Sequence, residues 1–257
     1  MPVHSLFFHD NSELSAVAVI ISLYNYKKYI VEAMDSVALQ TLESLELIVC
    51  DDCSTDNGPD LVAQWMERHT DRFCRIMLIG NEVNSGLPAT RNASLTMVSA
   101  PYTFVLDADN FIFPQCLARL RSILEEAPQE AAFAYSQRLV FDEDDPSDCR
   151  LENLPDWDPL RLWFGNYIDA MVLHRTSALR TMNGYTTDPP FDRVGWEDYE
   201  LTMRYSLHGW YGIKAHQPLM AYRKHKNSMV DNIHKVDNNP MLFKSMWERF
   251  TELYADD

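Results

Sequence analysis

The sequence predicts an α/β fold with a mixed, mostly parallel central sheet flanked by helices. Short apolar runs rich in β-branched residues occupy residues 16–23, 45–50, 73–79 and 102–106, a pattern typical of strands buried on both faces. Between them, apolar residues recur at helical spacing over about 30–38, 59–69 and 88–98. Strands that alternate with helices imply right-handed βαβ units, and therefore a mostly parallel sheet.

The second half of the chain is less regular. Its patterns predict strands over 131–141, 167–173 and 210–214, and helices near 176–182 and 197–207. The acidic run 142–148 is interpreted as a solvated loop. An amphipathic helix is predicted over 238–255, with its apolar face packed on the body of the protein; a peripheral contact with a membrane or a partner is the alternative. Because no linker interrupts the chain, residues 1–257 are interpreted as one domain.

Composition excludes several classes of protein. With 22 basic and 38 acidic residues, the net charge is −16, and the chain lacks the basic footprint of a nucleic-acid-binding protein. Five scattered cysteines argue against a disulfide framework, and the Cys50–Cys53 pair has no second pair at zinc-site spacing. No apolar run reaches the roughly 18 residues of a transmembrane segment, and residues 1–15 do not resemble a signal peptide. The expected location is therefore cytoplasmic.

Polar side chains follow three of the predicted strands. Ser22 and Tyr24 come at the end of the first strand, Asp51 follows the second, and Asp107 and Asp109 follow the fourth. Parallel sheets bind ligands at the carboxyl ends of their strands, so these side chains should meet at one edge. Two carboxylates at i and i+2 suit a divalent cation that also takes phosphate oxygens from a substrate. The pattern predicts a metal-and-diphosphate site.

Three further positions are candidates for chemistry. Arg91 lies one turn into a helix that follows a glycine, where anions are favoured, although a surface arginine is the alternative. Asp198 follows Trp196 at a helix start and is a candidate base with a raised pKa; the alternative is an acid that complements the helix dipole. His225 is either a structural histidine or a metal ligand.

Taken in order, six segments resemble the family 2 group of inverting glycosyltransferases, which have the GT-A (Rossmann-like) fold. The segments are VAVIISLYNYKKYIVEAMDSVALQT, LELIVCDDCSTDN, NSGLPATRNAS, YTFVLDADN, GWEDYELTMRYSLHG and YRKHKNSM. The resemblance spans roughly residues 17–229. It implies a nucleotide-binding half over about 15–110 and a C-terminal acceptor-binding half over about 111–230.

The resemblance also implies a role for each candidate residue. The nucleotide would be held by Ser22, Tyr24, Asp51, Arg91 and Asp107. Mn²⁺ or Mg²⁺ would be bound by Asp109 and His225, and Asp198 would deprotonate the acceptor hydroxyl. The pocket for the acceptor and the donor sugar would be lined by Trp196, Glu197, Asn166 and Asp169.

The implied activity is metal-dependent, inverting transfer of a sugar from a nucleotide sugar to a hydroxyl group. By resemblance the donor is a UDP-sugar, and the acceptor is a glycan or lipid-linked molecule in surface polysaccharide biosynthesis, met in the cytoplasm or at the inner face of the membrane. The chain has no Q-x-x-R-W motif, which favours a single transfer over processive synthesis. The alternatives are an inactive nucleotide-sugar-binding or scaffolding module, and a nucleotidyltransferase. The second needs a glycine-rich loop, and SLYNYKKYI contains no glycine.

Overall fold

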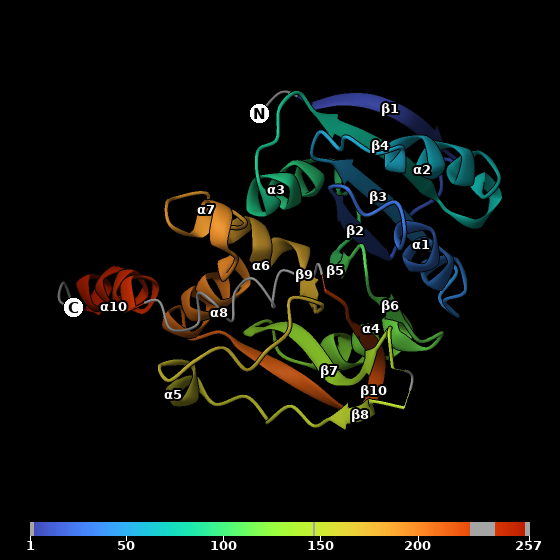
Figure 1. Cartoon of the computed structure of the whole chain (residues 1–257). Coiled ribbons are helices and arrows are strands. Elements are labelled where there is room, and N and C mark those ends of the chain that lie inside the picture. The colour runs from blue at the N-terminus through green and yellow to red at the C-terminus, as the bar shows by residue number, and fades with distance from the viewer. Residues whose placement is uncertain (1–2, 146, 227–239, 255–257) are drawn as a thin grey trace.

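The computed structural model describes residues 3–145, 147–226 and 240–254. Ten strands form one sheet in the order β1-β4-β3-β2-β5-β9-β7-β10-β6, with β8 paired to β7 (Figure 1). The strands are β1 (Val3–Asp10), β2 (Val17–Leu23), β3 (Leu45–Asp51), β4 (Arg75–Asn81), β5 (Tyr102–Asp107), β6 (Phe111–Ile112), β7 (Ala131–Asp142), β8 (Cys149–Glu152), β9 (Leu173–Arg175) and β10 (Tyr211–Lys224).

The sheet is mixed and mostly parallel, which confirms the predicted fold class. Strands β4, β3, β2 and β5 are mutually parallel, and β10 is parallel to β7. Strand β9 is antiparallel to both β5 and β7, so it joins two parallel groups that run in the same direction. The antiparallel strands β1, β6 and β8 lie at the margins of the sheet.

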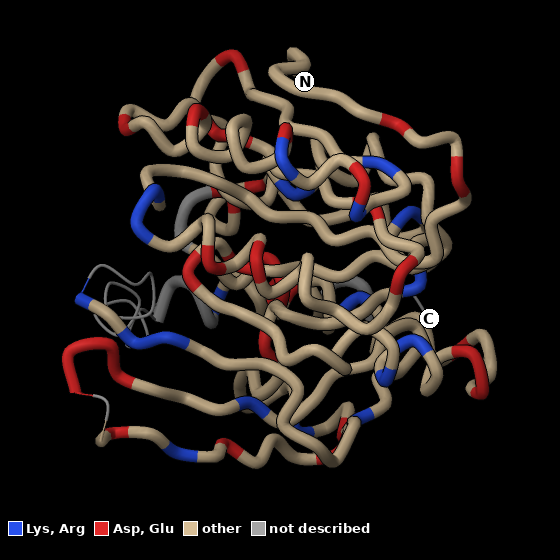
Figure 2. Tube along the Cα trace, turned by 90° about the vertical axis from the view of Figure 1, so that its right-hand side faces the viewer, with Lys and Arg blue, Asp and Glu red and all other residues tan. Residues whose placement is uncertain are grey.

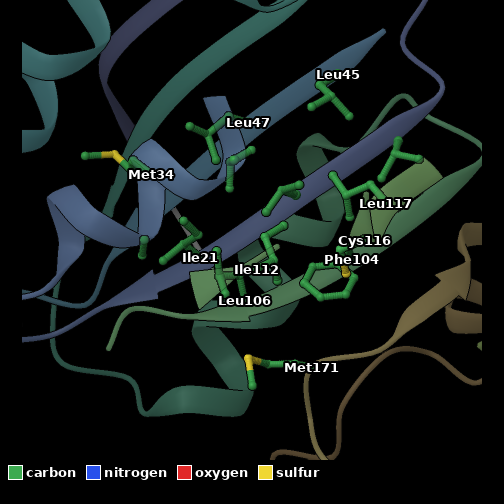
Figure 3. Close-up of a cluster of buried hydrophobic side chains, with 14 of the residues drawn as sticks. Ile21, Met34, Leu45, Leu47, Phe104, Leu106, Ile112, Cys116, Leu117 and Met171 are labelled. Carbon is green, nitrogen blue, oxygen red and sulfur yellow. The ribbon is translucent and has the colours of Figure 1, made fainter. Parts of the chain in front are cut away.

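Helices cover both faces of the sheet. They are α1 (Ile30–Ala38), α2 (Gly58–Glu67), α3 (Leu87–Met97), α4 (Cys116–Glu126), α5 (Pro159–Leu162), α6 (Thr176–Thr181), α7 (Phe191–Val194), α8 (Glu197–Leu207) and α10 (Pro240–Tyr254). Residues of α1, α2 and α4 pack with Val19 and Ile21 of β2, whereas residues of α3, α6 and α8 pack with Ala18 and Ile20. Alternate side chains of this strand therefore fill two cores, as its unbroken apolar pattern predicts. Figure 3 shows the first of these cores, around Ile21.

The predicted strand over 167–173 is mostly wrong, because only Leu173–Arg175 is extended. The side chain of Asn166 accepts a hydrogen bond from the Ile168 N–H (3.1 Å), and that of Asp169 accepts one from the Met171 N–H (2.8 Å). These local bonds curl the backbone and compete with strand pairing. The segment predicted as a strand is therefore mostly a loop, and this loop carries two of the four predicted pocket residues, Asn166 and Asp169.

Several elements differ from the sequence-based expectation in extent. Strand β10 continues to Lys224, ten residues beyond the predicted end, and β1 and α4 were not anticipated. Helix α10 buries Met246 and Phe250 against α5, α7 and α8, so it packs on the body of the protein. Residues 238, 239 and 255 of the predicted helix lie outside the described residues. Over the ranges that the structure describes, no helix has the length and apolar character needed to cross a membrane.

Candidate functional site

The carboxyl ends of three neighbouring strands bring the predicted nucleotide-side residues together. In the register of the sheet, Ser22 of β2 is paired with Asp107 of β5 on one side, and Leu23 is paired with Asp51 of β3 on the other. Tyr24 follows directly after β2 and is 44% exposed. The carboxyl ends of β2, β3 and β5 therefore lie side by side at one edge of the sheet. Ligands of open α/β sheets bind at this edge.

Two adjacent aspartates at the end of β3 have different surroundings. Asp51 accepts a hydrogen bond from the Ser54 N–H (3.1 Å), and burial raises its pKa. Asp52, which sequence reasoning placed at the same strand end without a role separate from that of Asp51, accepts hydrogen bonds from the N–H groups of Ser85 (2.7 Å) and Gly86 (2.8 Å). Gly86 has a φ of 89°, a conformation that favours glycine, and it precedes the first turn of α3. Asp52 thus fixes the turn from which α3 presents its side chains.

Arg91, on α3, lies at the centre of the site rather than on its surface. Its side chain is 3% exposed; Nη2 lies 2.9 Å from Asp107 Oδ1, and Nη1 is paired with Glu197 Oε1. Sequence reasoning placed Arg91 at a diphosphate, but both of its Nη atoms already have carboxylate partners. One guanidinium therefore joins the D-A-D segment of β5 to the start of α8, a link that the sequence did not indicate.

The buried pairing of Arg91 predicts a large cost for its loss. Arg91→Met leaves Glu197 without a cation in a buried site, and we expect the free energy of unfolding to fall by about 3 kcal/mol. Urea denaturation at neutral pH measures the change. Arg121→Met, which breaks an i,i+4 pair at the surface, is the matched control and should cost less than about 0.5 kcal/mol. Equal, small changes in both variants would contradict this role.

The D-A-D segment places its two carboxylates in different environments. Burial raises the pKa of Asp107 to about 7, against the opposing effect of Arg91. Asp109 Oδ2 lies 2.9 Å from Nε2 of His225, whose side chain is 2% exposed. Arg223 Nε donates a hydrogen bond to the Asp109 carbonyl (2.9 Å). Strand β10 thus brings His225 to Asp109 across 116 residues of sequence.

Asp109 and His225 fit two adjacent positions of a divalent cation. Ligands at right angles in an octahedron with bonds of about 2.1 Å lie about 3 Å apart, and the two side-chain atoms are 2.9 Å apart. Within the described part of the chain, no group of three or more His, Cys, Asp or Glu residues is arranged to hold a metal ion. Among the described residues, Asp109 and His225 are thus two candidate ligands. A cation held by them would need further oxygen atoms, such as those that Mg²⁺ commonly takes from a substrate.

The start of α8 carries the candidate base. Trp196 has a φ of 71°, so the backbone turns sharply just before the helix begins. Burial, reinforced by Glu197, raises the pKa of Asp198 to about 7. Its Oδ2 accepts a hydrogen bond from Asn166 Nδ2 (3.3 Å). Oε2 of Glu197 is buried and has no hydrogen-bond partner among the described residues, so it is an acceptor whose capacity is unused there.

Asp169 has a charged partner that sequence reasoning missed. Arg138 of β7 is paired with Asp169 Oδ2, and its guanidinium lies 4.7 Å from the centre of the Tyr222 ring. Burial raises the pKa of Tyr222, and the charges of Asp169, Asp107 and Asp109 raise it further. The charges of all three carboxylates therefore act on the Tyr222 hydroxyl.

The residues that sequence reasoning missed share one property: they are recognisable only from their contacts. They come from four separate segments of the chain, and all but Arg138 lie within segments that resemble the family, yet no motif indicates their contacts. The signal that remained available was charge, because a buried arginine in so acidic a protein needs carboxylate partners. In Figure 2 basic positions are scattered among acidic ones along the trace. The missed residues are Asp52, Asn110, Arg138, Tyr222 and Arg223.

Comparison with known proteins identifies the family. The sequence model of Glycosyl transferase family 2 matches residues 18–180. The chain belongs to glycosyltransferase family 2. Among its relatives is EpsE of Bacillus subtilis (strain 168), named as a glycosyltransferase, which is 28% identical over 233 residues; the alignment covers 89% of this chain and 81% of EpsE.

Solved structures share the fold of this family 2 glycosyltransferase. TarS of S. aureus, residues 1–349 in complex with UDP, superposes with a TM-score of 0.65 at 20% identity and covers 81% of this chain. The mannosyltransferase PcManGT of Pyrobaculum calidifontis, in complex with GDP-Man and Mn²⁺, gives a TM-score of 0.64 at 18% identity and covers 86%. In both cases the chain spans 60% of the solved chain. The central sheet is therefore that of the GT-A glycosyltransferases.

Proposed function

We propose that this protein is a metal-dependent, inverting glycosyltransferase that moves one sugar per encounter from a nucleotide sugar to an acceptor hydroxyl. A single observation carries the proposal: Arg91 joins the start of α8, which holds Asp198, to the D-A-D segment of β5. The buried Arg91 guanidinium thus holds a candidate base close to the carboxylates proposed to face the diphosphate. This arrangement suits in-line displacement at a sugar carbon. The presence of both a candidate base, Asp198, and a candidate metal-binding pair, Asp109 and His225, argues against an inactive module.

Asp198 acts as the general base in this proposal. With a pKa of about 7, its carboxylate is basic enough to take the proton of an acceptor hydroxyl and is still largely ionised just above neutral pH. Asn166 orients one of its oxygens through the 3.3 Å hydrogen bond. The unpartnered Oε2 of Glu197 accepts a hydrogen bond from a sugar hydroxyl beside it. Attack from the side of Asp198 inverts the configuration at the anomeric carbon.

The nucleotide-sugar donor binds at the carboxyl ends of β2, β3 and β5 in this proposal. Ser22, Tyr24 and Asp51 hold the nucleoside, and Asp107 lies toward the ribose and diphosphate. Asp109 and His225 hold Mn²⁺ or Mg²⁺, which when bound neutralises the charge that develops on the leaving diphosphate. Arg91 keeps Asp107 in place rather than contacting the diphosphate itself.

The nucleotide is proposed to be UDP, which is the ligand of the TarS complexes, although the PcManGT complex with GDP-Man keeps GDP as the competing choice. The acceptor is proposed to be a glycan or lipid-linked precursor of a surface polysaccharide, reached from the cytoplasmic side.

The chain is proposed to form one catalytic domain, in which the nucleotide-binding half ends between β5 and β6.

A thermal-shift screen of nucleotide sugars, with and without Mn²⁺, tests the proposal. We expect one donor to raise the melting temperature by several degrees in the presence of Mn²⁺ and little in its absence, because ligand binding stabilises the folded state by mass action. That donor should then be hydrolysed slowly with water as the acceptor. No shift with any donor would contradict the proposed function, and a shift without hydrolysis or transfer would favour the inactive nucleotide-sugar-binding module.

A further inference from the structure

The acidic run that was interpreted as a solvated loop contributes a residue to the site. Glu143 lies just beyond the end of β7, and its side chain is 16% exposed. Its N–H donates to the carbonyl of Lys224 (3.1 Å), because β7 and β10 stay in parallel register up to the pair Asp142 and Lys224. This register places Glu143 beside His225 at the ends of the two strands. The solvated interpretation is therefore wrong for the first residue after β7.

Glu143 is held by the segment that leads into α1. The Tyr29 hydroxyl lies 3.0 Å from each carboxylate oxygen of Glu143, and Lys28 Nζ lies 2.9 Å from Oε2. Tyr29 is 8% exposed, whereas the Lys28 side chain is 65% exposed. The exposed ion pair contributes little, so the tyrosine hydroxyl is the contact that fixes the carboxylate.

The ring of Tyr29 contacts both side chains that approach Asp109. Its centroid lies 4.8 Å from that of His225, and 5.2 Å from the guanidinium carbon of Arg223. His225 contacts the side-chain carboxylate of Asp109, and Arg223 contacts the backbone carbonyl of Asp109. Displacing the ring would therefore loosen two separate contacts of Asp109.

We propose that Tyr29 and Glu143 form a positioning pair that holds the His225 imidazole against Asp109. The inference rests on the proposed function, because it assigns the pair to the metal site of that same reaction. Glu143 anchors the Tyr29 hydroxyl, and the Tyr29 ring limits the rotation of the imidazole. Neither residue contacts the cation. Outer residues that orient a ligand commonly change metal affinity by about tenfold or more when they are removed.

The test measures Mn²⁺ affinity rather than activity. Free Mn²⁺ is followed by electron paramagnetic resonance in the presence of UDP, and of GDP in parallel, for wild type, Tyr29→Phe and Glu143→Gln. We expect each variant to bind Mn²⁺ about tenfold more weakly. Asp145→Asn is the matched control, because it removes one charge from the same loop and because, among the described residues, its side chain bonds within the loop, to Ser147. It should keep the wild-type affinity.

A double-mutant cycle separates positioning from a general loss of structure. If Glu143 acts through His225, then Glu143→Gln should have no further effect on Mn²⁺ affinity in a His225→Ala background. Additive losses, or wild-type affinity in both single variants, would overturn the inference while leaving the proposed function in place. If one single variant fails to fold by circular dichroism, the other carries the test. Absence of nucleotide-dependent Mn²⁺ binding in the wild-type protein would overturn the proposed metal site, and the inference with it.

Discussion

Replacing Asp198 with Asn should reduce sugar transfer by about 10³-fold while leaving the fold intact, because positioned general bases contribute roughly 10²–10⁴-fold. The amide keeps the size of the carboxylate and can still bond to Asn166. Burial and the charge of Glu197 disfavour the ionised form of Asp198, so replacing it with a neutral amide is not expected to reduce stability. Donor binding should also be retained, since Asp198 lies on the acceptor side. Steady-state transfer or donor hydrolysis measures the loss, and calorimetry measures the binding.

The pH dependence gives a second readout of the same residue. Its pKa is raised to about 7, so Asp198 is protonated and inactive as a base below neutral pH, and it becomes active as the pH rises through 7. We expect kcat/KM of the wild type to rise over that interval, and the residual activity of Asp198→Asn to lose the Asp198-dependent part of this rise. Asp60→Asn is the control, because Asp60 also lies in the first turn of a helix. An equal effect in both variants would favour the helix-dipole interpretation of Asp198.

Replacing Asp109 with Ala should abolish the dependence of donor binding on Mn²⁺ and reduce transfer by about 10³-fold, the scale of losing one group that stabilises charge at a leaving group. Asp109 supplies one of the two protein ligands proposed, and its partner His225 alone offers too few donors. Isothermal titration with the donor, with and without Mn²⁺, measures the change.

Two comparisons define what the Asp109 result means. His225→Ala should weaken Mn²⁺-dependent donor binding in the same direction, because it removes the other ligand. Asp71→Ala, an exposed acid in the short 3₁₀ turn Thr70–Arg72, should leave it unchanged. Mn²⁺-dependent binding of wild-type strength in Asp109→Ala would show that the cation is held elsewhere.

The first half of the fold follows closely from the sequence because its pattern is strong and local. Strands β2, β3 and β5 are apolar on both faces, and each lies within one or two residues of its predicted bounds. The second half was harder because side chains there decide the backbone. Asn166 and Asp169 bond to nearby N–H groups and turn an apolar, aromatic segment into a loop. Helix α4 has Leu117, Leu120 and Leu124 at helical spacing and was accessible to the same reasoning.

For the site, the sequence indicated which residues take part but not how they contact one another. The residues after β2, β3 and β5 could be placed at one edge, because parallel strands end on the same side. The pairing of His225 with Asp109 was expected only from the family resemblance, and the register of β10 provides it. The double pairing of Arg91 and the contact of Glu143 with Tyr29 join segments 16 to 114 residues apart, and no local pattern encodes them.

Titration of the selected nucleotide sugar into the wild type, Asp109→Ala and Asp198→Asn, each with and without Mn²⁺, tests the central claim most directly because it separates donor binding from chemistry. We expect Mn²⁺-dependent binding in the wild type and in Asp198→Asn, with loss of transfer in the latter, and no Mn²⁺ dependence in Asp109→Ala. Mn²⁺-dependent binding that survives in Asp109→Ala, or transfer that survives in Asp198→Asn, would contradict the proposed function.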